Sequence, residues 1–395
     1  MLQALSARKC LSGFFLTGIL VAFLGAILPA WGYHLSSSFL TVGNFFLSLN
    51  IGMLASIKPA LHLLSRRGIR FLLILASSLA SAGFFYLALV PPASSPWWRL
   101  AGVLVLGAGA GLMSTAVFHA ISPLYTRDAA ATLNLAGAFF GLGCLVTVLL
   151  VAGAFYVYTV PSILILLALI PAYFAGIFAK SRFDLLPLPH QPSLREAIHD
   201  FRSPGALLFS LLLFVQFGNE WSVAGWLPIF LVQRLGASPA AALKILAAYW
   251  LALLIGRFAM QAILPRVRHG KVLLLSGLSA LFGCAILFYT RNLFGAASGV
   301  LFIGAGFAAI YPVVAEMIGD RFPYYHPGFF NGIFSLASTG GLLAPWTLGI
   351  YAHLWGIRTV MVLPVLGACA VFLLAVLIWV YARLTRIPEV RGVPT

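Results

Sequence analysis

The sequence is poor in charged residues, above all in acidic ones. Of its 395 residues only 8% are charged, with eight Asp or Glu against 24 Lys or Arg. Soluble globular domains carry about 25% charged residues, so the composition excludes an ordinary soluble fold. Because 62% of the residues are hydrophobic, we expect lipid to be the solvent for most of the chain.

Cysteine is also scarce, and the sequence lacks the spacings of metal or redox sites. Its four cysteines stand far apart, within or beside apolar runs, as is typical of free buried thiols: Cys10, Cys144, Cys284 and Cys369. No His-Glu-x-x-His or Gly-x-Ser-x-Gly motif occurs. We therefore expect no metal, no cofactor and no enzymatic activity, with a membrane-embedded enzyme as the less favoured alternative.

The excess of basic residues gives a formal net charge of +16, which in a soluble protein would suggest nucleic-acid binding. Here the basic residues lie between apolar runs, where the positive-inside rule places them. We interpret this charge as a sign of membrane topology, and we expect the lipid bilayer and a small molecule as partners and no nucleic acid.

Twelve apolar runs approach the roughly 20 residues needed to cross a bilayer. Six precede and six follow a polar, proline-rich interval: 11–31, 39–58, 71–90, 100–121, 129–151, 157–179, then 206–232, 240–264, 272–289, 293–318, 329–353 and 360–381. The sequence predicts an all-α membrane protein with an N-terminal six-helix bundle (1–180), a cytoplasmic linker (181–204) and a C-terminal six-helix bundle (205–395).

The positions of Lys and Arg predict the orientation of these spans. With the N-terminus in the cytoplasm, most basic residues fall in cytoplasmic segments, and four fall on the other side: Arg99, Arg234, Arg291 and Arg358. This bias predicts that both termini are cytoplasmic. We expect a monomeric multi-pass protein of a cell membrane, the inner membrane in a bacterium.

The two halves of the chain repeat one another in order. Short motifs match at offsets of about 200 residues: Leu28-Pro29 with Leu227-Pro228, Arg66-Arg67-Gly68 with Arg268-His269-Gly270, Gly107-Ala108-Gly109 with Gly304-Ala305-Gly306, Asn134 with Asn331, and Gly143 with Gly340. Parallel repeats of six spans are typical of transporters whose halves rock about a central cavity. The repeats therefore predict a secondary transporter that works by alternating access.

The loop after the second span, residues 61–70, reads Leu-His-Leu-Leu-Ser-Arg-Arg-Gly-Ile-Arg. It resembles the signature of the major facilitator superfamily, roughly Gly-x-Leu-Ala-Asp-Arg-x-Gly-Arg-Lys, with Ser65 in place of the Asp and Leu61 in place of the first Gly. A second copy runs from Gly256 to Lys271. The resemblance covers essentially the whole chain and implies two pseudo-symmetric six-helix bundles.

Other motifs resemble the fucose- and glucose-type sugar permeases within that superfamily: Asn134 with Gly141-x-Gly143, Gly218-Asn219-Glu220 with Gly225-Trp226, and Gly340-Gly341 before Pro345. This resemblance implies symport of a sugar or similar small polar solute with H⁺ or Na⁺. The first span lacks the Asp that some fucose-type symporters use, so their proton mechanism does not carry over intact. Efflux of drugs or amphipathic metabolites is the alternative, since aromatic residues are plentiful.

Two acids, Glu220 and Glu316, lie inside predicted spans. A charge at the bilayer centre costs at least about 2.5 kcal/mol, so such residues usually pair or work. Glu220 lies halfway along the seventh span, and Gln216 and Asn219 share its helix face. Because burial favours the protonated form of a carboxyl group, we expect Glu220 to bind the coupling ion; a protonated Glu220 bonded to a neighbouring helix is the alternative.

Amide and aromatic side chains at mid-span are the expected substrate contacts, because sugar sites combine amide hydrogen bonds with stacking on rings. These candidates are Asn134, Gln216, Asn219, Trp226, Trp250 and Asn331. For each Asn the alternative is an interhelical hydrogen bond, worth about 0.6–2 kcal/mol.

Four charged residues near the predicted cytoplasmic ends of the spans are the expected gate: Arg66, Arg257, Arg268 and Glu316. We expect Arg257 and Glu316 to form an inner-gate salt bridge that breaks when the cavity opens to the cytoplasm. The alternative is a static pair, or two separate side chains that snorkel to the interface.

Overall fold

The computed structural model describes the backbone of residues 2–36, 38–91, 94–125, 129–181, 183, 204–264, 266–321 and 327–384. Over these ranges the chain forms eleven α-helices and one short 3₁₀ helix, and no strand. The prediction of an all-α membrane protein is therefore confirmed. The predicted linker, 181–204, lies largely outside the described residues.

The helices follow the predicted apolar runs closely. The first half of the chain forms α1 (Leu2–Ala30), η1 (Tyr33–Leu35), α2 (Phe39–Leu89), α3 (Pro96–Tyr125), α4 (Ala129–Ala154) and α5 (Val160–Lys180). The second half forms α7 (Pro204–Leu235), α8 (Pro239–Ile263), α9 (His269–Tyr289), α10 (Leu293–Arg321), α11 (Pro327–Trp355) and α12 (Thr359–Leu384).

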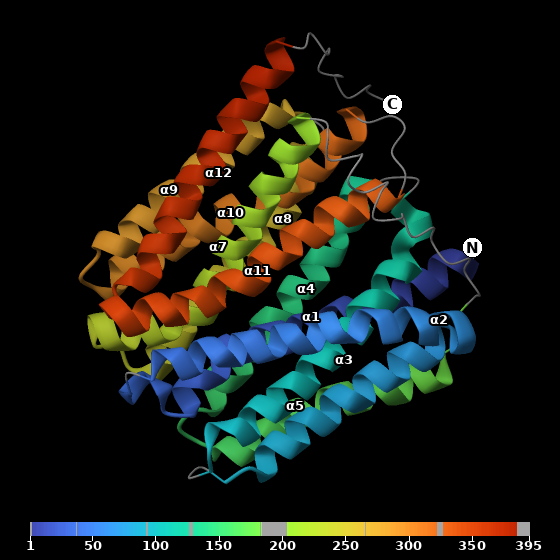
Figure 1. The fold of residues 1–395 in the computed structure, drawn as a ribbon, viewed down its shortest axis with the longest axis vertical. Helices are drawn as coiled ribbons and strands as arrows, with labels where there is room; N and C mark the ends of the chain where they lie inside the picture. The colour runs from blue at the N-terminus through green and yellow to red at the C-terminus, as the bar shows by residue number, and fades with distance from the viewer. Residues whose placement is uncertain are drawn as a thin grey trace.

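One helix, α2, contains two of the twelve predicted spans. It is 51 residues long, and Gly68 breaks it with φ 75° and ψ 175°, a conformation that glycine adopts far more readily than other residues. The chain folds back at this corner (Figure 1). By length and composition, ten helices in the described part of the chain can span a membrane, with the long helix α2 counted once. Helix α11, which is 29 residues long, is not among these ten and corresponds to the eleventh predicted span.

Two bundles face each other, α1–α5 and α7–α12 (Figure 1). In the first, α1 packs on α4, and α2 packs on α3 and α5; in the second, α7 packs on α11, α8 on α10 and α9 on α12. Each pairing in one bundle has its repeat-related counterpart in the other. The two pseudo-symmetric bundles predicted from the sequence repeats are confirmed.

The seam between the bundles obeys the same symmetry. The first half of α2 packs on α11, and α4 packs on α8, and these two pairs exchange when the halves are swapped. The seam runs between two faces of the protein. We call the "terminal face" the one with residues 66–70, 179–181 and 266–269, and the "opposite face" the one with residues 31–36 and 154–159. Which face is cytoplasmic stays a prediction.

Helix packing within the bundles depends on glycine at points of close approach. A Cβ on Gly107 of α3 would overlap the backbone of Leu49 of α2, with its carbonyl carbon only 2.8 Å away. Small residues at helix contacts allow this approach in membranes, where close packing replaces the hydrophobic driving force.

We expect Gly107→Ala to lower the free energy of unfolding by roughly 1–3 kcal/mol, because the new methyl group would meet backbone that cannot move cheaply. The measurement is the midpoint of thermal unfolding in detergent. Gly176→Ala is the matched control, since the space around Gly176 of α5 is open; its midpoint should hold or rise slightly. An equal loss in both variants would contradict this account of the α2–α3 contact.

Candidate functional site

The centre of the protein contains a buried ion pair. Glu220, halfway along α7, is 3% exposed, and Arg257 of α8 is 7% exposed. Nη2 of Arg257 lies 3.8 Å from Oε1 of Glu220. This distance exceeds the 2.7–2.9 Å typical of a charge-assisted hydrogen bond, so the pair is held by charge attraction more than by a formed hydrogen bond.

Polar side chains around this pair have unused hydrogen-bonding groups. Gln216, one turn before Glu220, interacts with the carboxylate, yet neither of its amide atoms completes a hydrogen bond of ordinary geometry. The buried indole Nε1 of Trp250 also has no partner. Buried polar groups are normally satisfied, and exceptions call for an explanation such as a ligand or water.

A row of three aromatic rings in contact connects the region of the ion pair with the first bundle. The hydroxyl of Tyr249 donates to the backbone carbonyl of Glu220 at 3.4 Å. The Tyr249 ring lies 5.1 Å from that of Trp250, which in turn lies 6.2 Å from Phe140 of α4. These edge-on contacts fix the position of the Trp250 ring at the seam.

Arg257 itself touches both bundles. Its guanidinium occupies the space that a Cβ on Gly137 of α4 would fill. Its backbone carbonyl accepts a hydrogen bond of 2.8 Å from Nδ2 of Asn134, also on α4. Arg257, whose positive charge balances that of Glu220, therefore also joins α8 to the first bundle.

A small cavity at the seam is lined in part by Trp250. Its volume is about 20 Å³, and α1, α2, α7, α8 and α11 all contribute to its wall. Asn50, Trp221 and Trp250 are its lining residues with polar side-chain groups, and the other lining residues are apolar. A cavity of this size accommodates a water molecule but not a sugar.

The seam above the cavity, towards the opposite face, is sealed by Trp226. The indole of Trp226 is fully buried against Phe39 and Phe46, and its Nε1 donates to the carbonyl of Pro345 at 2.9 Å. Nearby, Nδ2 of Asn50 donates to the carbonyl of Leu342 at 2.7 Å. Trp226, predicted as a substrate contact, lies in this closed contact between α2, α7 and α11.

Asn219 faces another way than predicted. The sequence places Gln216, Asn219 and Glu220 on one helix face, but the amide of Asn219 rests on Gly367 of α12. Neighbouring residues of a helix point about 100° apart, and α7 has α8 on one side and α12 on another. The expected shared face is thus corrected: Glu220 points to α8 and Asn219 to α12.

The expected pairing of Arg257 with Glu316 is also corrected. Arg257 pairs with Glu220, and Oε2 of Glu316 lies 3.4 Å from Nε2 of His269 at the start of α9. The long Arg257 side chain turns to the buried acid, whereas Glu316 lies near the terminal face, where a polar partner is at hand. Arg66 and Arg268 are exposed on that face.

Two further residues were predicted as substrate contacts, and the structure describes the side chain of one of them. Asn134 lies at the site but is bonded to backbone, and the side chain of Asn331 lies outside the described residues. Sequence reasoning missed Gly137 and His269. Gly137 follows Asn134 at helical spacing, which would have indicated that both face the same neighbouring helix.

Comparison with known proteins agrees with this architecture. Residues 10–345 match the family model described as Major Facilitator Superfamily. The chain is 24% identical over 381 residues to the protein TsgA homolog of Buchnera aphidicola subsp. Baizongia pistaciae, with 94% of each chain covered. It is 23% identical over 348 residues to an uncharacterised MFS-type transporter of Yersinia pestis, covering 86% of this chain and 87% of that protein.

Solved structures share the fold at lower sequence identity. A variant of the E. coli fucose:proton symporter FucP superimposes with a TM-score of 0.65 and 17% identity, over 95% of this chain and 99% of that one. An outward-conformation structure of FucP gives a TM-score of 0.61 and 18% identity, over 94% and 98%. With the repeated bundles, the seam and the family match in agreement, the chain belongs to the major facilitator superfamily of membrane transporters.

Proposed function

We propose that the protein is a secondary active transporter that works by alternating access and carries a sugar or similar small polar solute together with H⁺. The observation that carries this proposal is the buried pair of Glu220 and Arg257, which lies at the seam and touches both bundles. An acid in this position can take up a proton and change the contact between the bundles in the same step.

Protonation of Glu220 would remove the charge that holds Arg257. The guanidinium on Gly137 and the bond from Asn134 to the Arg257 carbonyl are contacts that must break for the bundles to part near the terminal face. A change in the charge state of Glu220 therefore biases one conformation over the other, which is the requirement for coupling.

The coupling ion is better explained as H⁺ than as Na⁺. A sodium ion needs several oxygen ligands, whereas the carboxylate of Glu220 has the guanidinium of Arg257 beside it. A fixed positive charge at 3.8 Å repels a second cation. FucP, which is similar in fold, is a fucose:proton symporter, and this supports the same type of coupling.

The solute would bind next to the ion pair once the seam opens. Trp250 offers a ring face and an unused N–H, and Gln216 offers its amide oxygen. Hydrogen-bonding groups beside an aromatic face suit a sugar. One observation favours efflux of amphipathic compounds as the second candidate: most residues that line the closed cavity are apolar.

Glu220→Gln should abolish proton-driven accumulation and retain exchange, because Gln is permanently neutral and cannot release a proton. The measurement is uptake of radiolabelled sugars into proteoliposomes under an imposed pH gradient, followed by counterflow without a gradient. Glu316→Gln makes the same chemical change near the terminal face and should still accumulate solute, even at an altered rate. Unchanged driven uptake in Glu220→Gln would remove Glu220 from the coupling role.

The ion pair also predicts a stability pattern. Removal of one partner of a buried pair typically costs about 3–5 kcal/mol, and Glu220→Gln leaves the charge of Arg257 uncompensated. Arg257→Gln should cost less, because the remaining Glu220 can become neutral by binding a proton. The double variant should recover most of the thermal midpoint in detergent. Additive losses in the double variant would show that the two residues do not act as a pair.

The substrate class can be tested by counterflow with a panel of hexoses and pentoses. Trp250→Phe keeps the ring and removes the N–H, so we expect the half-saturating concentration to rise about fivefold, as for a lost hydrogen bond. Ser279→Ala, on α9 away from the seam, is the control. No counterflow with any sugar, together with drug sensitivity of cells lacking the protein, would favour efflux.

A further inference from the structure

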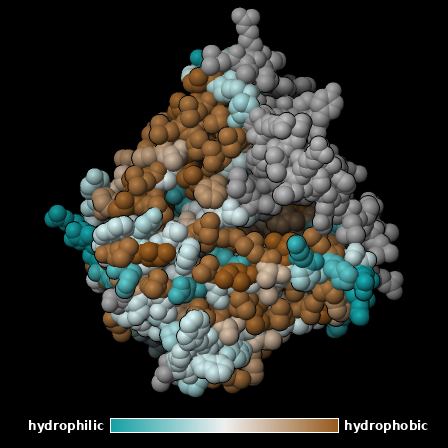
Figure 2. All heavy atoms as spheres, viewed as in Figure 1, coloured by the Kyte–Doolittle hydropathy of each residue, from teal (hydrophilic) through white to brown (hydrophobic). Residues whose placement is uncertain are grey.

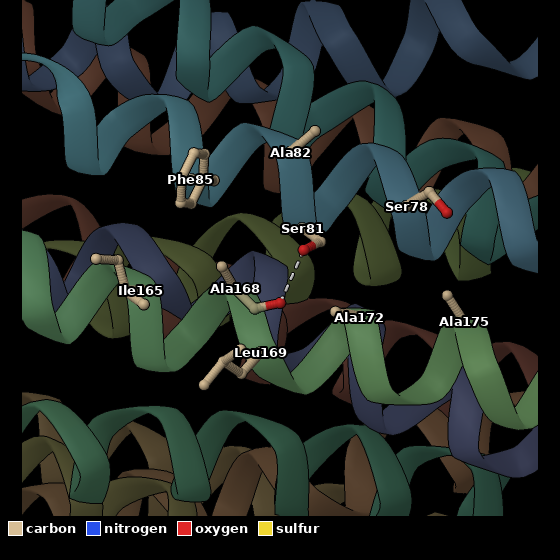
Figure 3. Close-up of a pocket in the computed structure, with 9 residues that line it drawn as sticks. All are labelled: Ser78, Ser81, Ala82, Phe85, Ile165, Ala168, Leu169, Ala172 and Ala175. Atoms are coloured by element: carbon tan, nitrogen blue, oxygen red, sulfur yellow. Dashed lines mark hydrogen bonds between the residues drawn. The ribbon is translucent and has the colours of Figure 1, made fainter.

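A groove on the outer surface of the first bundle lies between the second half of α2 and α5. Its volume is about 460 Å³, which falls within the range of small-molecule sites. Small side chains form its floor, among them Ser81, whose hydroxyl donates to the carbonyl of Ala168 at 2.9 Å (Figure 3). Phe85 and Leu169, 51% and 59% exposed, form part of its wall at one end.

The same two helix faces continue from the groove to the terminal face. On α2, Arg70, Ser78, Ser81 and Phe85 recur at spacings close to whole helical turns. On α5, the residues Ala168, Ala172, Ala175 and Ala179 do the same. A guanidinium N–H of Arg70 donates to the carbonyl of Ala179, so Arg70 bridges the two helices at the end of the groove.

This end of the groove is strongly basic. Arg66, Arg67, Arg70 and Lys180 are all exposed there, and we call them the basic corner. Neither α2 nor α5 contains an acidic residue. Hydrophilic side chains stand out over this end of α2 beside a largely hydrophobic flank (Figure 2). Arg67 lies over the ring of Phe71 at 5.1 Å, and Arg70 has five N–H donors, of which the bond to Ala179 uses one.

We propose that the groove and the basic corner together bind one anionic phospholipid. The phosphate would lie on the basic corner, where arginine forms charge-assisted bonds to phosphate oxygens, and an acyl chain would lie along the groove between α2 and α5. Basic pockets between membrane helices are suited to such headgroups. Because acyl chains gain little on moving from bulk lipid to an apolar groove, the charge would decide which lipid binds.

The charges argue against a second copy of the chain as the occupant. Two copies that met through this groove would bring their basic corners towards each other, with no acid on α2 or α5 to compensate. Like charges repel, whereas a phospholipid supplies both the missing negative charge and a narrow chain.

The test is native mass spectrometry of the purified full-length protein in detergent, titrated with phosphatidylglycerol or with phosphatidylcholine. We expect the wild type to bind one phosphatidylglycerol at least about fivefold more tightly than phosphatidylcholine. Each basic residue near a membrane surface contributes about fivefold in affinity for anionic lipid. The double variant Arg67→Gln, Lys180→Gln should therefore bind phosphatidylglycerol about 25-fold more weakly.

Matched variants separate the site from general charge and from general surface changes. Arg266→Gln with Lys271→Gln removes two exposed charges at the equivalent corner of the second bundle and should leave the affinity unchanged. Ala172→Phe fills the groove without a change of charge and should also weaken binding several-fold. Leu373→Phe, at a residue of α12 that is itself 60% exposed, should leave the affinity unchanged.

Three results would overturn the proposal. One is equal affinity of the wild type for the two lipids, a comparison that needs no variant to fold. Another is an equal loss of affinity in the two charge-removal variants. The third is full displacement of phosphatidylglycerol by glycerol 3-phosphate at comparable concentration, which would show that the groove contributes nothing.

Discussion

The buried pair of Glu220 and Arg257 is the interaction on which the central arrangement depends. Each charge is removed from water and lipid alike, and neither would persist at this depth without the other. Their separation of 3.8 Å leaves the pair short of a full hydrogen bond. A contact that is necessary but loose can be remade, whereas a tight bidentate bridge between α7 and α8 would hold the Arg257 side chain in one position.

The contacts between the bundles differ in kind between the two sides of the seam. Towards the opposite face, the stacked rings of Phe46 and Trp226 and the hydrogen bond from Asn50 to the backbone of α11 join the bundles. Gln233 of α7 adds bonds to the carbonyls of His34 and Ser36. Around Arg257, contacts depend on a side chain whose partner can change its charge.

Individual residues show which features of the site helical spacing in the sequence can predict. It placed Glu220 correctly at mid-helix, and the structure buries it as expected. It failed for Asn219, because a helix in a bundle has several neighbours and one apolar-to-polar pattern does not say which neighbour a side chain meets. It also failed for the partner of Arg257, since an Arg side chain reaches far from its own backbone position and its direction is set by packing.

The sequence by itself determined the class of solvent, the number of spans and the pseudo-symmetry of the bundles. These follow from features that can be read along the chain: charge content, the length of apolar runs and the order of repeated motifs. The bilayer constrains spanning segments strongly, because every backbone polar group inside it must be hydrogen-bonded within the protein. The tertiary structure alone decided which polar groups meet, which of them stay unsatisfied, and how closely the seam is shut. Those features depend on distances between helices far apart in the chain, which side-chain packing sets and no sequence period encodes.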